Sequence, residues 1–217
     1  MITAFVLAFT CLFRNSEYVG KYAVQVKDVA FEVVIGSKVS VIPAHSIVLR
    51  RVLDSQIQGV IINNSRSKTD RGGNGYRYHF RRQLPGATVA FDVVIVLFDW
   101  AKLAQAESVD PFLSYRGERI LSYSDLQKAA KRVAKSLSLD ASRYTSHSFR
   151  VGGASQLAAG GTPDYIIMKM GRWKSLAFLD YIRESSSFFS VALSKLTNPS
   201  LLTLHQLQCF NSSVQLH

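Results

Sequence analysis

The sequence predicts an α+β fold that is mainly α, in which a small antiparallel β-sheet packs at one edge of a helical core. Two observations predict it. Val- and Ile-rich segments with partial alternation lie within residues 24–82, and segments with helical spacing of apolar residues follow. The 217 residues, 47% hydrophobic and 19% charged, can bury one core and fall outside the disordered class. We expect one domain over residues 1–190 and a tail over residues 191–217 that can form a docking helix.

The apolar segment from Met1 to Phe13 is expected to be part of a buried helix. It lacks the basic residues that precede the core of a signal peptide, and it is too short to span a bilayer. We assign the first helix to Phe5–Tyr18, with Arg14 and Glu17 just past its apolar part. A chain that starts with a hydrophobic helix also suggests an upstream domain that is absent from this sequence.

Two pairs of strands are expected next. The first pair has a turn at Gly36-Ser37, and the second is joined by the polar, basic and glycine-rich loop SRSKTDRGGNG. The four expected strands are Val24–Val34, Val39–Leu49, Val60–Asn64 and Tyr76–Arg82.

Helices are expected over most of the remaining domain. A helical pattern covers Val89–Ala106, and the capping-box sequence Ser124-Asp-Leu-Gln127 opens the next helix. The later helices begin at caps, and the first two of them end at glycines. They are His147–Ala159 after Ser146, a short helix that Thr162-Pro163 opens and Gly171 ends, and Leu176–Glu184 after Ser175.

The charge balance favours a polyanionic partner. The chain has 26 Lys and Arg against 15 Asp and Glu, a formal net charge of +11 at pH 7, which suits nucleic acid or an anionic membrane surface. Four basic residues follow the capping-box sequence, and they form either a solvated face or a DNA contact: Lys128, Lys131, Arg132 and Lys135. The two cysteines, Cys11 and Cys209, lack metal-ligand spacing, so we expect a reducing compartment, no disulfide framework and no zinc site.

The segment from Tyr144 to Arg183 has the residue types needed for phosphodiester chemistry. His147 and Arg150 stand three apart at an expected helix start, where they share one face near the positive end of the dipole. A guanidinium gives two parallel hydrogen bonds to phosphate oxygens. The hydroxyl of Tyr181, with an ordinary pKa near 10, needs such a field and a base before it can attack phosphorus.

These residues carry a resemblance to a known family. The run HSFRVGGASQLAAGGTPDYIIMKMGRWKSLAFLDYIR resembles the catalytic core of the tyrosine recombinases, or phage integrase family, and most of all the versions in eukaryotic Crypton-like and DIRS-like mobile elements. CLFRNSEYVG resembles the segment with the first catalytic arginine, here Arg14. SRSKTDRGGNG resembles the hairpin with the catalytic lysine, here Lys68. The likeness extends over about residues 5–185.

The resemblance implies DNA strand breakage and rejoining through a 3′-phosphotyrosyl intermediate at Tyr181, with no cofactor or metal. Arg14 and Arg150 would hold the phosphate, His147 would act as base and Lys68 as acid. Trp173 would take the family's His-or-Trp position, although Arg172 stands where many members have histidine, so either residue is a candidate. The implied DNA-binding residues are Arg66, Arg71, Lys128, Arg132, Arg172 and Lys174.

Simpler interpretations stand beside these roles. Arg14 can extend from a helix end and pair with Glu17, and Lys68 can make an ordinary contact to the DNA backbone. The family usually has an amino-terminal helical domain, which nothing before Arg14 supplies. The alternative function is therefore a truncated or domesticated DNA-binding module without catalysis.

The expected partners are double-stranded DNA and further copies of this chain, as a dimer or tetramer on DNA. No membrane and no small-molecule substrate is expected. The expected location is intracellular, and nuclear in a eukaryote.

Overall fold

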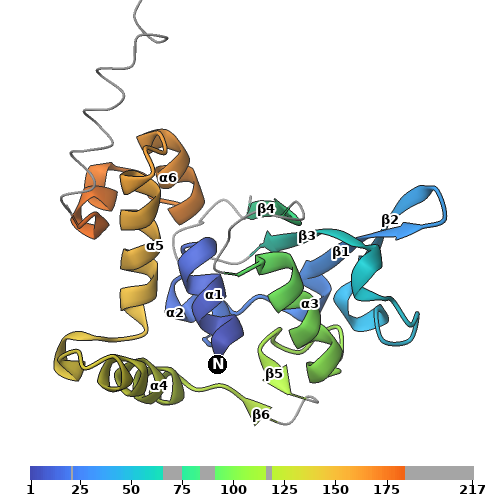
Figure 1. Cartoon of the computed structure of the whole chain (residues 1–217), viewed down its shortest axis with the longest axis horizontal. Coiled ribbons are helices and arrows are strands. Elements are labelled where there is room, and N and C mark those ends of the chain that lie inside the picture. Colours follow the sequence, from blue (N-terminus) through green and yellow to red (C-terminus); the bar gives the residue numbers. More distant parts are fainter. Residues whose placement is uncertain (21, 66–74, 84–90, 116–118, 184–217) are drawn as a thin grey trace, which may run out of the picture.

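A computed structural model of the chain describes residues 1–20, 22–65, 75–83, 91–115 and 119–183. The described residues form an α+β structure that is mainly α, as the sequence predicts. Figure 1 shows the sheet on one side of the molecule and the α5–α6 region on the other, with the first helix between them. The expected tail over residues 191–217 lies outside the described residues.

The principal sheet has four antiparallel strands in the order β2-β1-β3-β4. These strands are β1 (Val29–Ile35), β2 (Lys38–Pro43), β3 (Ile57–Asn64) and β4 (Tyr76–Arg81). Gly36 has a φ of +61°, which suits the tight turn between β1 and β2. A second, two-stranded sheet, β5 (Ser114–Tyr115) with β6 (Arg119–Ile120), was not expected from the sequence.

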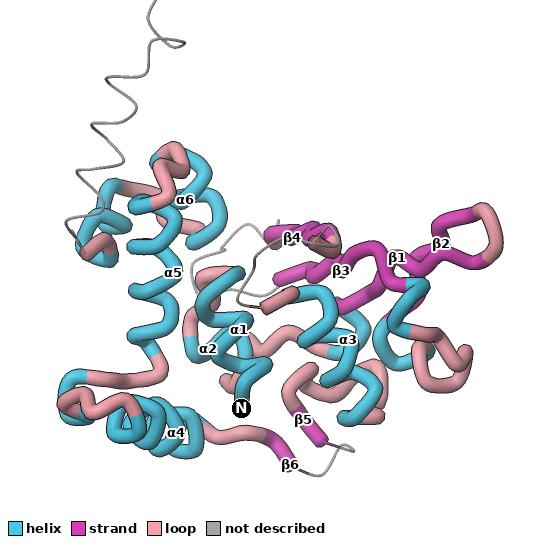
Figure 2. Tube along the Cα trace, in the orientation of Figure 1, coloured by secondary structure: helices cyan, strands magenta, loops and turns pink. Residues whose placement is uncertain are grey.

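Helices supply the rest of the architecture, as the tube in Figure 2 shows. The α-helices are α1 (Ile2–Thr10), α2 (Asn15–Tyr18), α3 (Val93–Ala104), α4 (Tyr123–Ser136), α5 (His147–Ala159) and α6 (Asp164–Gly171). The 3₁₀ helices are η1 (Val26–Asp28), η2 (Ala44–Ser46), η3 (Asp54–Gln56), η4 (Ala141–Arg143) and η5 (Leu176–Tyr181). No helix in the described part of the chain is both long and apolar enough to cross a membrane.

Several expected boundaries were wrong for identifiable reasons. The first helix is interrupted between α1 and α2, where Leu12 adopts a φ of +50° that an α-helix cannot contain. The capping box of α4 uses Ser122 and Asp125, two residues earlier than the expected pair. The strand that was expected to begin at Val24 begins later, because η1 precedes β1. The strand that was expected to end at Leu49 ends earlier, because η2 follows β2.

The caps of the later helices also differ in part from expectation. Ser146 precedes α5 but does not cap it, and the hydroxyl of Thr145 accepts the hydrogen bond from the His147 N–H instead. Pro163 precedes α6 rather than opening it. Ser175 does cap the last segment, which is a 3₁₀ helix ending at Tyr181.

The core has two parts. The larger part lies between the sheet, α1 and α3, where Phe31 and Phe98 meet edge to face with ring centroids 5.4 Å apart. The smaller part lies between α5, α6 and η5, and it contains Leu12, Ala154, Ala158, Ile167 and Phe178. Leu12, near the start of the chain, therefore packs in the smaller core together with α5, α6 and η5.

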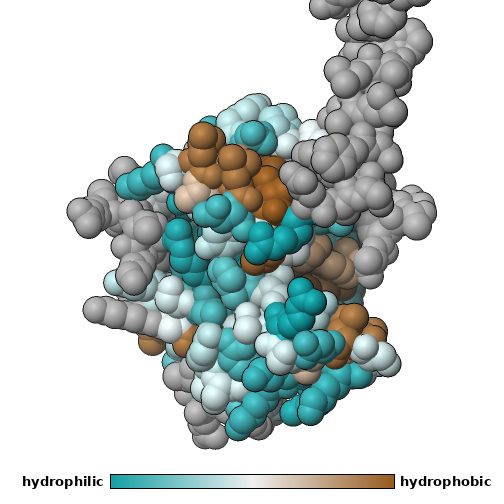
Figure 3. Space-filling model, turned by 90° about the vertical axis from the view of Figure 1, so that its left-hand side faces the viewer, coloured by the Kyte–Doolittle hydropathy of each residue, from teal (hydrophilic) through white to brown (hydrophobic). Residues whose placement is uncertain are grey.

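The face viewed in Figure 3 is mostly hydrophilic, with apolar residues gathered toward its upper end. This is the level of α6 and η5 in Figure 1. Exposed apolar side chains in η5 are Leu176 and Leu179.

Candidate active site

The position of α5 against α1 depends on a glycine. A Cβ atom at Gly153 would lie 2.1 Å from the carbonyl oxygen of Phe9, which no real contact allows. One turn earlier, the rings of Phe5 and Phe149 stack with centroids 3.9 Å apart. Gly153, the second glycine of the HSFRVGG motif, therefore permits α5 to approach α1 closely, which brings Arg150 to the break after α1.

Arg150 lies at the centre of the candidate site, and only 1% of the residue is exposed. One terminal nitrogen donates to the carbonyl of Leu12 and the other to the carbonyl of Gly171, at 2.9 Å for the latter. These bonds join the α1–α2 break to the end of α6. The Nε–H of Arg150 has no hydrogen-bond partner in the described structure.

Two aromatic rings cover the guanidinium of Arg150. Its central carbon lies 4.4 Å from the ring centroid of Trp173 and 5.4 Å from that of Tyr181. Both distances are in the range of cation–π contacts. Trp173 fits here because Gly171 has no side chain. A Cβ atom at Gly171 would lie 1.7 Å from the indole ring of Trp173.

Tyr181, at the end of η5, also contacts His147. Their ring centroids are 5.3 Å apart at an interplanar angle of 65°, and the ring of Tyr181 lies 4.9 Å from that of Trp173. The structure thus brings together four of the six residues to which the resemblance gives catalytic roles: His147, Arg150, Trp173 and Tyr181. It places Trp173, rather than Arg172, against Arg150 and Tyr181.

Arg14 belongs to the same electrostatic environment. It precedes α2, where its backbone N–H donates to Glu17 at 2.7 Å and its guanidinium lies 3.5 Å from the same carboxylate. The ion pair with Glu17 that the simpler interpretation expected is therefore present. The side chain of Arg14 remains 25% exposed, whereas that of Glu17 is fully buried.

The pKa values show how tightly the positive charges are grouped. Burial and the charge of Arg14 lower the pKa of Arg150 to about 10, while Glu17 and Tyr181 oppose that shift. Burial, followed by the charges of Arg150 and Arg14, lowers the pKa of His147 below its ordinary 6.5. His147 is consequently biased toward its neutral form, which can accept a proton.

Arg172, an expected DNA-binding residue, has a largely buried side chain. Its side chain is 9% exposed and forms an ion pair with Glu17. It also donates to the hydroxyl of Tyr78 and to the carbonyl of Met170, the latter at 2.9 Å. Burial lowers its pKa, and the neighbouring Glu17 acts against this.

Tyr78 was missed by the sequence interpretation. It lies on β4, and its hydroxyl donates to the carbonyl of Met170 at 2.6 Å. The available signal was the alternation Tyr76, Tyr78, Phe80, which marks the inward face of the strand. The carbonyls of Leu12 and Gly171 carry no such signal.

The remaining predicted residues lie elsewhere. Lys128 and Arg132 are exposed on α4, and Lys174 is exposed between α6 and η5. Lys68, Arg66 and Arg71 fall outside the described residues, so the expected general acid has no described position. Among the described residues, no group of three or more His, Cys, Asp or Glu side chains is arranged to hold a metal ion.

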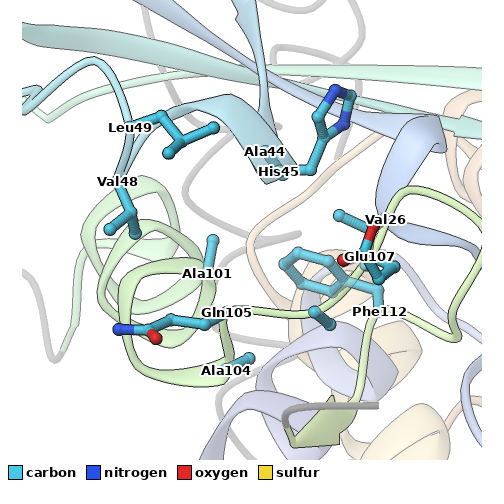
Figure 4. Close-up of a pocket in the computed structure, with 11 residues that line it drawn as sticks. Val26, Ala44, His45, Val48, Leu49, Ala101, Ala104, Gln105, Glu107 and Phe112 are labelled. Atoms are coloured by element: carbon cyan, nitrogen blue, oxygen red, sulfur yellow. The ribbon is translucent and has the colours of Figure 1, made fainter.

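A cavity of about 300 Å³ lies apart from these residues, between η2 and the end of α3. Figure 4 shows its largely apolar lining, with Val48, Leu49, Ala101 and Phe112 around the opening and His45 and Glu107 at its margin. None of the candidate site residues lines this cavity.

Comparison with known proteins adds no family assignment. No protein-family model matches the chain. No curated protein sequence matches it either. The resemblance to the tyrosine recombinases therefore depends on the sequence motifs alone.

Proposed function

We propose that this chain is the catalytic domain of a tyrosine-type site-specific DNA recombinase, which breaks and rejoins DNA strands for a mobile element. The single observation that carries the proposal is the meeting of Tyr181 with Arg150 and His147. The three residues come from the start of α5 and the end of η5, and Tyr181 contacts both of the others.

In the proposed reaction, the phenol oxygen of Tyr181 attacks the scissile phosphorus and the bond to the 5′-oxygen breaks. His147 accepts the phenolic proton, and the leaving 5′-oxygen takes a proton from an acid, for which Lys68 is the candidate. Guanidinium groups at Arg14 and Arg150 stabilise the charge on the non-bridging oxygens. A strand with a free 5′-hydroxyl reverses the step, so no external energy source is needed.

The electrostatics support an anionic substrate. Besides burial, the charge of Arg14 lowers the pKa of both Arg150 and Arg172, whereas the carboxylate of Glu17 opposes both shifts. Three guanidinium groups with one buried carboxylate leave an excess of positive charge in a poorly solvated region. A bound phosphodiester would compensate this excess.

The decisive experiment uses a nicked suicide DNA substrate, from which a short 5′-hydroxyl strand diffuses away after cleavage. The wild-type chain should form a covalent complex that survives denaturation, and Tyr181→Phe should form none. Tyr165→Phe, which changes an exposed tyrosine on α6, is the matched control and should trap normally. Equal trapping by wild type and Tyr181→Phe would reject the proposal.

A second candidate function is DNA binding without catalysis. It is favoured by the nearly complete burial of Arg150, whose two terminal nitrogens donate to backbone carbonyls beneath the rings of Trp173 and Tyr181. This function predicts salt-sensitive binding with no covalent product. Affinity that is equal at low and physiological salt would count against it.

A further inference from the structure

Arg172 has more contacts to the other candidate site residues than its position in the sequence suggests. It follows α6 in the left-handed region, with a φ of +56°, and this turns its side chain under the α1–α2 break. There its guanidinium carbon lies 5.3 Å from the ring of Phe13 and 5.7 Å from that of Tyr78. The group therefore lies between two aromatic rings, and its side chain is only 9% exposed.

The hydrogen bonds of Arg172 are shared with both candidate phosphate-binding arginines. One terminal nitrogen bonds to Glu17, whose carboxylate also binds the backbone and guanidinium of Arg14. The same nitrogen lies 3.4 Å from the carbonyl of Leu12, which also accepts from Arg150. Arg172 thus has one partner in common with Arg14 and another in common with Arg150.

We propose that Arg172 is a positioning residue, which holds Glu17 and the Leu12 carbonyl so that Arg14 and Arg150 keep the separation needed to bind one phosphate. This inference rests on the proposed function. Arg172 itself touches no substrate in this scheme. It acts by occupying part of the Glu17 carboxylate, which leaves the Arg14 guanidinium partly exposed.

Lysine cannot replace arginine in this role. A guanidinium donates in several fixed directions, and here it reaches Glu17, Tyr78 and Met170 at once. An ammonium keeps the charge but cannot keep that set of bonds. In Arg172→Lys, Glu17 is expected to draw the guanidinium of Arg14 toward itself, away from His147 and Arg150.

The first test is independent of activity. The pKa of His147 would be measured by NMR titration in the DNA-free wild type, in Arg172→Lys and in Arg143→Lys, an exposed control on η4. In Arg172→Lys the pKa of His147 should rise toward its ordinary value, because the charge of Arg14 has moved away. It should stay unchanged in Arg143→Lys. An unchanged value in a folded Arg172→Lys would overturn the inference.

The second test measures DNA cleavage and binding separately. Arg172→Lys should slow single-turnover trapping of the covalent complex by roughly tenfold or more, with DNA affinity and its salt dependence unchanged. A trapping rate equal to that of the wild type would overturn the inference. If Arg172→Lys does not fold, Tyr78→Phe removes one hydrogen-bond partner of Arg172 and should shift the same quantities in the same direction.

The two proposals fail in different ways. Absence of a covalent complex in the wild type rejects strand transfer, and the His147 titration then decides the role of Arg172 alone. Normal trapping by wild type and by Arg172→Lys leaves strand transfer standing and removes the positioning role.

Discussion

The ring of Tyr181 lies over the guanidinium of Arg150, with 5.4 Å between the guanidinium carbon and the ring centroid. The candidate nucleophile therefore covers the group that is expected to hold its target. With 1% of Arg150 exposed, a phosphate cannot reach its guanidinium unless neighbouring side chains move.

The packing of α5 on α1 is tested by two adjacent glycines. Gly153→Ala should lower the free energy of unfolding by about 2–3 kcal/mol, because its Cβ would overlap the carbonyl of Phe9. Gly152→Ala is the matched control. Its Cβ would lie 3.7 Å from the ring of Phe9, an ordinary contact, and alanine favours a helix by about 1 kcal/mol. Urea unfolding of both variants measures the difference, and equal stabilities would contradict the described packing.

The burial of Cys11 predicts an unreactive thiol. Burial raises the pKa of Cys11 to about 12, so the thiolate that reacts with disulfide reagents is scarce at pH 8. In a Cys209→Ser variant, in which Cys11 is the remaining cysteine, a coloured thiol reagent should detect no thiol in the native protein. It should detect one after denaturation. Fast labelling of the native variant would show that the α1–α2 break is open.

DNA binding should raise the pKa of His147. In the free protein the charges of Arg150 and Arg14 help to lower that pKa, and a bound phosphate would offset them. At pH values between the pKa of His147 in the free protein and its pKa in the complex, DNA binding should therefore be accompanied by proton uptake. Calorimetry in buffers of different ionisation enthalpy measures that uptake, and His147→Gln should abolish it. Proton release by the wild type would contradict the assignment.

The pH dependence of strand cleavage has the same origin. His147 acts as a base only when it is neutral, so the single-turnover rate should rise with pH through the pKa of His147 in the DNA complex and then level off. His147→Gln should give a slower rate without this rise. A rate that falls over the same interval would exclude His147 as the base.

The expected contact of Lys128 on α4 with DNA is tested by salt dependence. Lys128→Gln should reduce the slope of log affinity against log salt by about 0.9 if Lys128 contacts a phosphate. Lys38→Gln changes an equally exposed lysine at the β1–β2 turn, distant from α4 in Figure 1, and should leave the slope unchanged. Filter binding or fluorescence anisotropy at several salt concentrations provides the slopes. An unchanged slope in Lys128→Gln would indicate that Lys128 lies on a solvated face of α4 and does not contact DNA.

The sequence predicted the elements of this fold better than their ends. The strands follow from alternation, and the bounds of α5 agree with those expected from Ser146 before the helix and Gly160-Gly161 after it. The break after α1 could not be predicted, because the φ of +50° at Leu12 is a conformation that a leucine rarely adopts. The cap of α4 lies two residues earlier than expected, because Ser122 and Asp125 make both bonds of the capping box.

The candidate site was predictable in its residue types but not in their exposure. Motifs identified Arg150 and Tyr181, and the structure brings them together. They did not indicate that Arg150 is buried beneath aromatic rings, or that Arg172 bonds to Glu17 across 155 positions. Such contacts depend on how α6 packs against the start of the chain. The residue pattern within either segment does not predict that packing.

The hydrogen bond from Arg150 to the Leu12 carbonyl spans 138 residues of sequence. A chain emerging from the ribosome therefore exposes its first helix long before the arginine that closes it exists. Local helix formation in α1 cannot produce the site, because closure over so long a loop comes late in folding. A growing polypeptide would thus lack the assembled candidate site until α5, α6 and η5 have been synthesised.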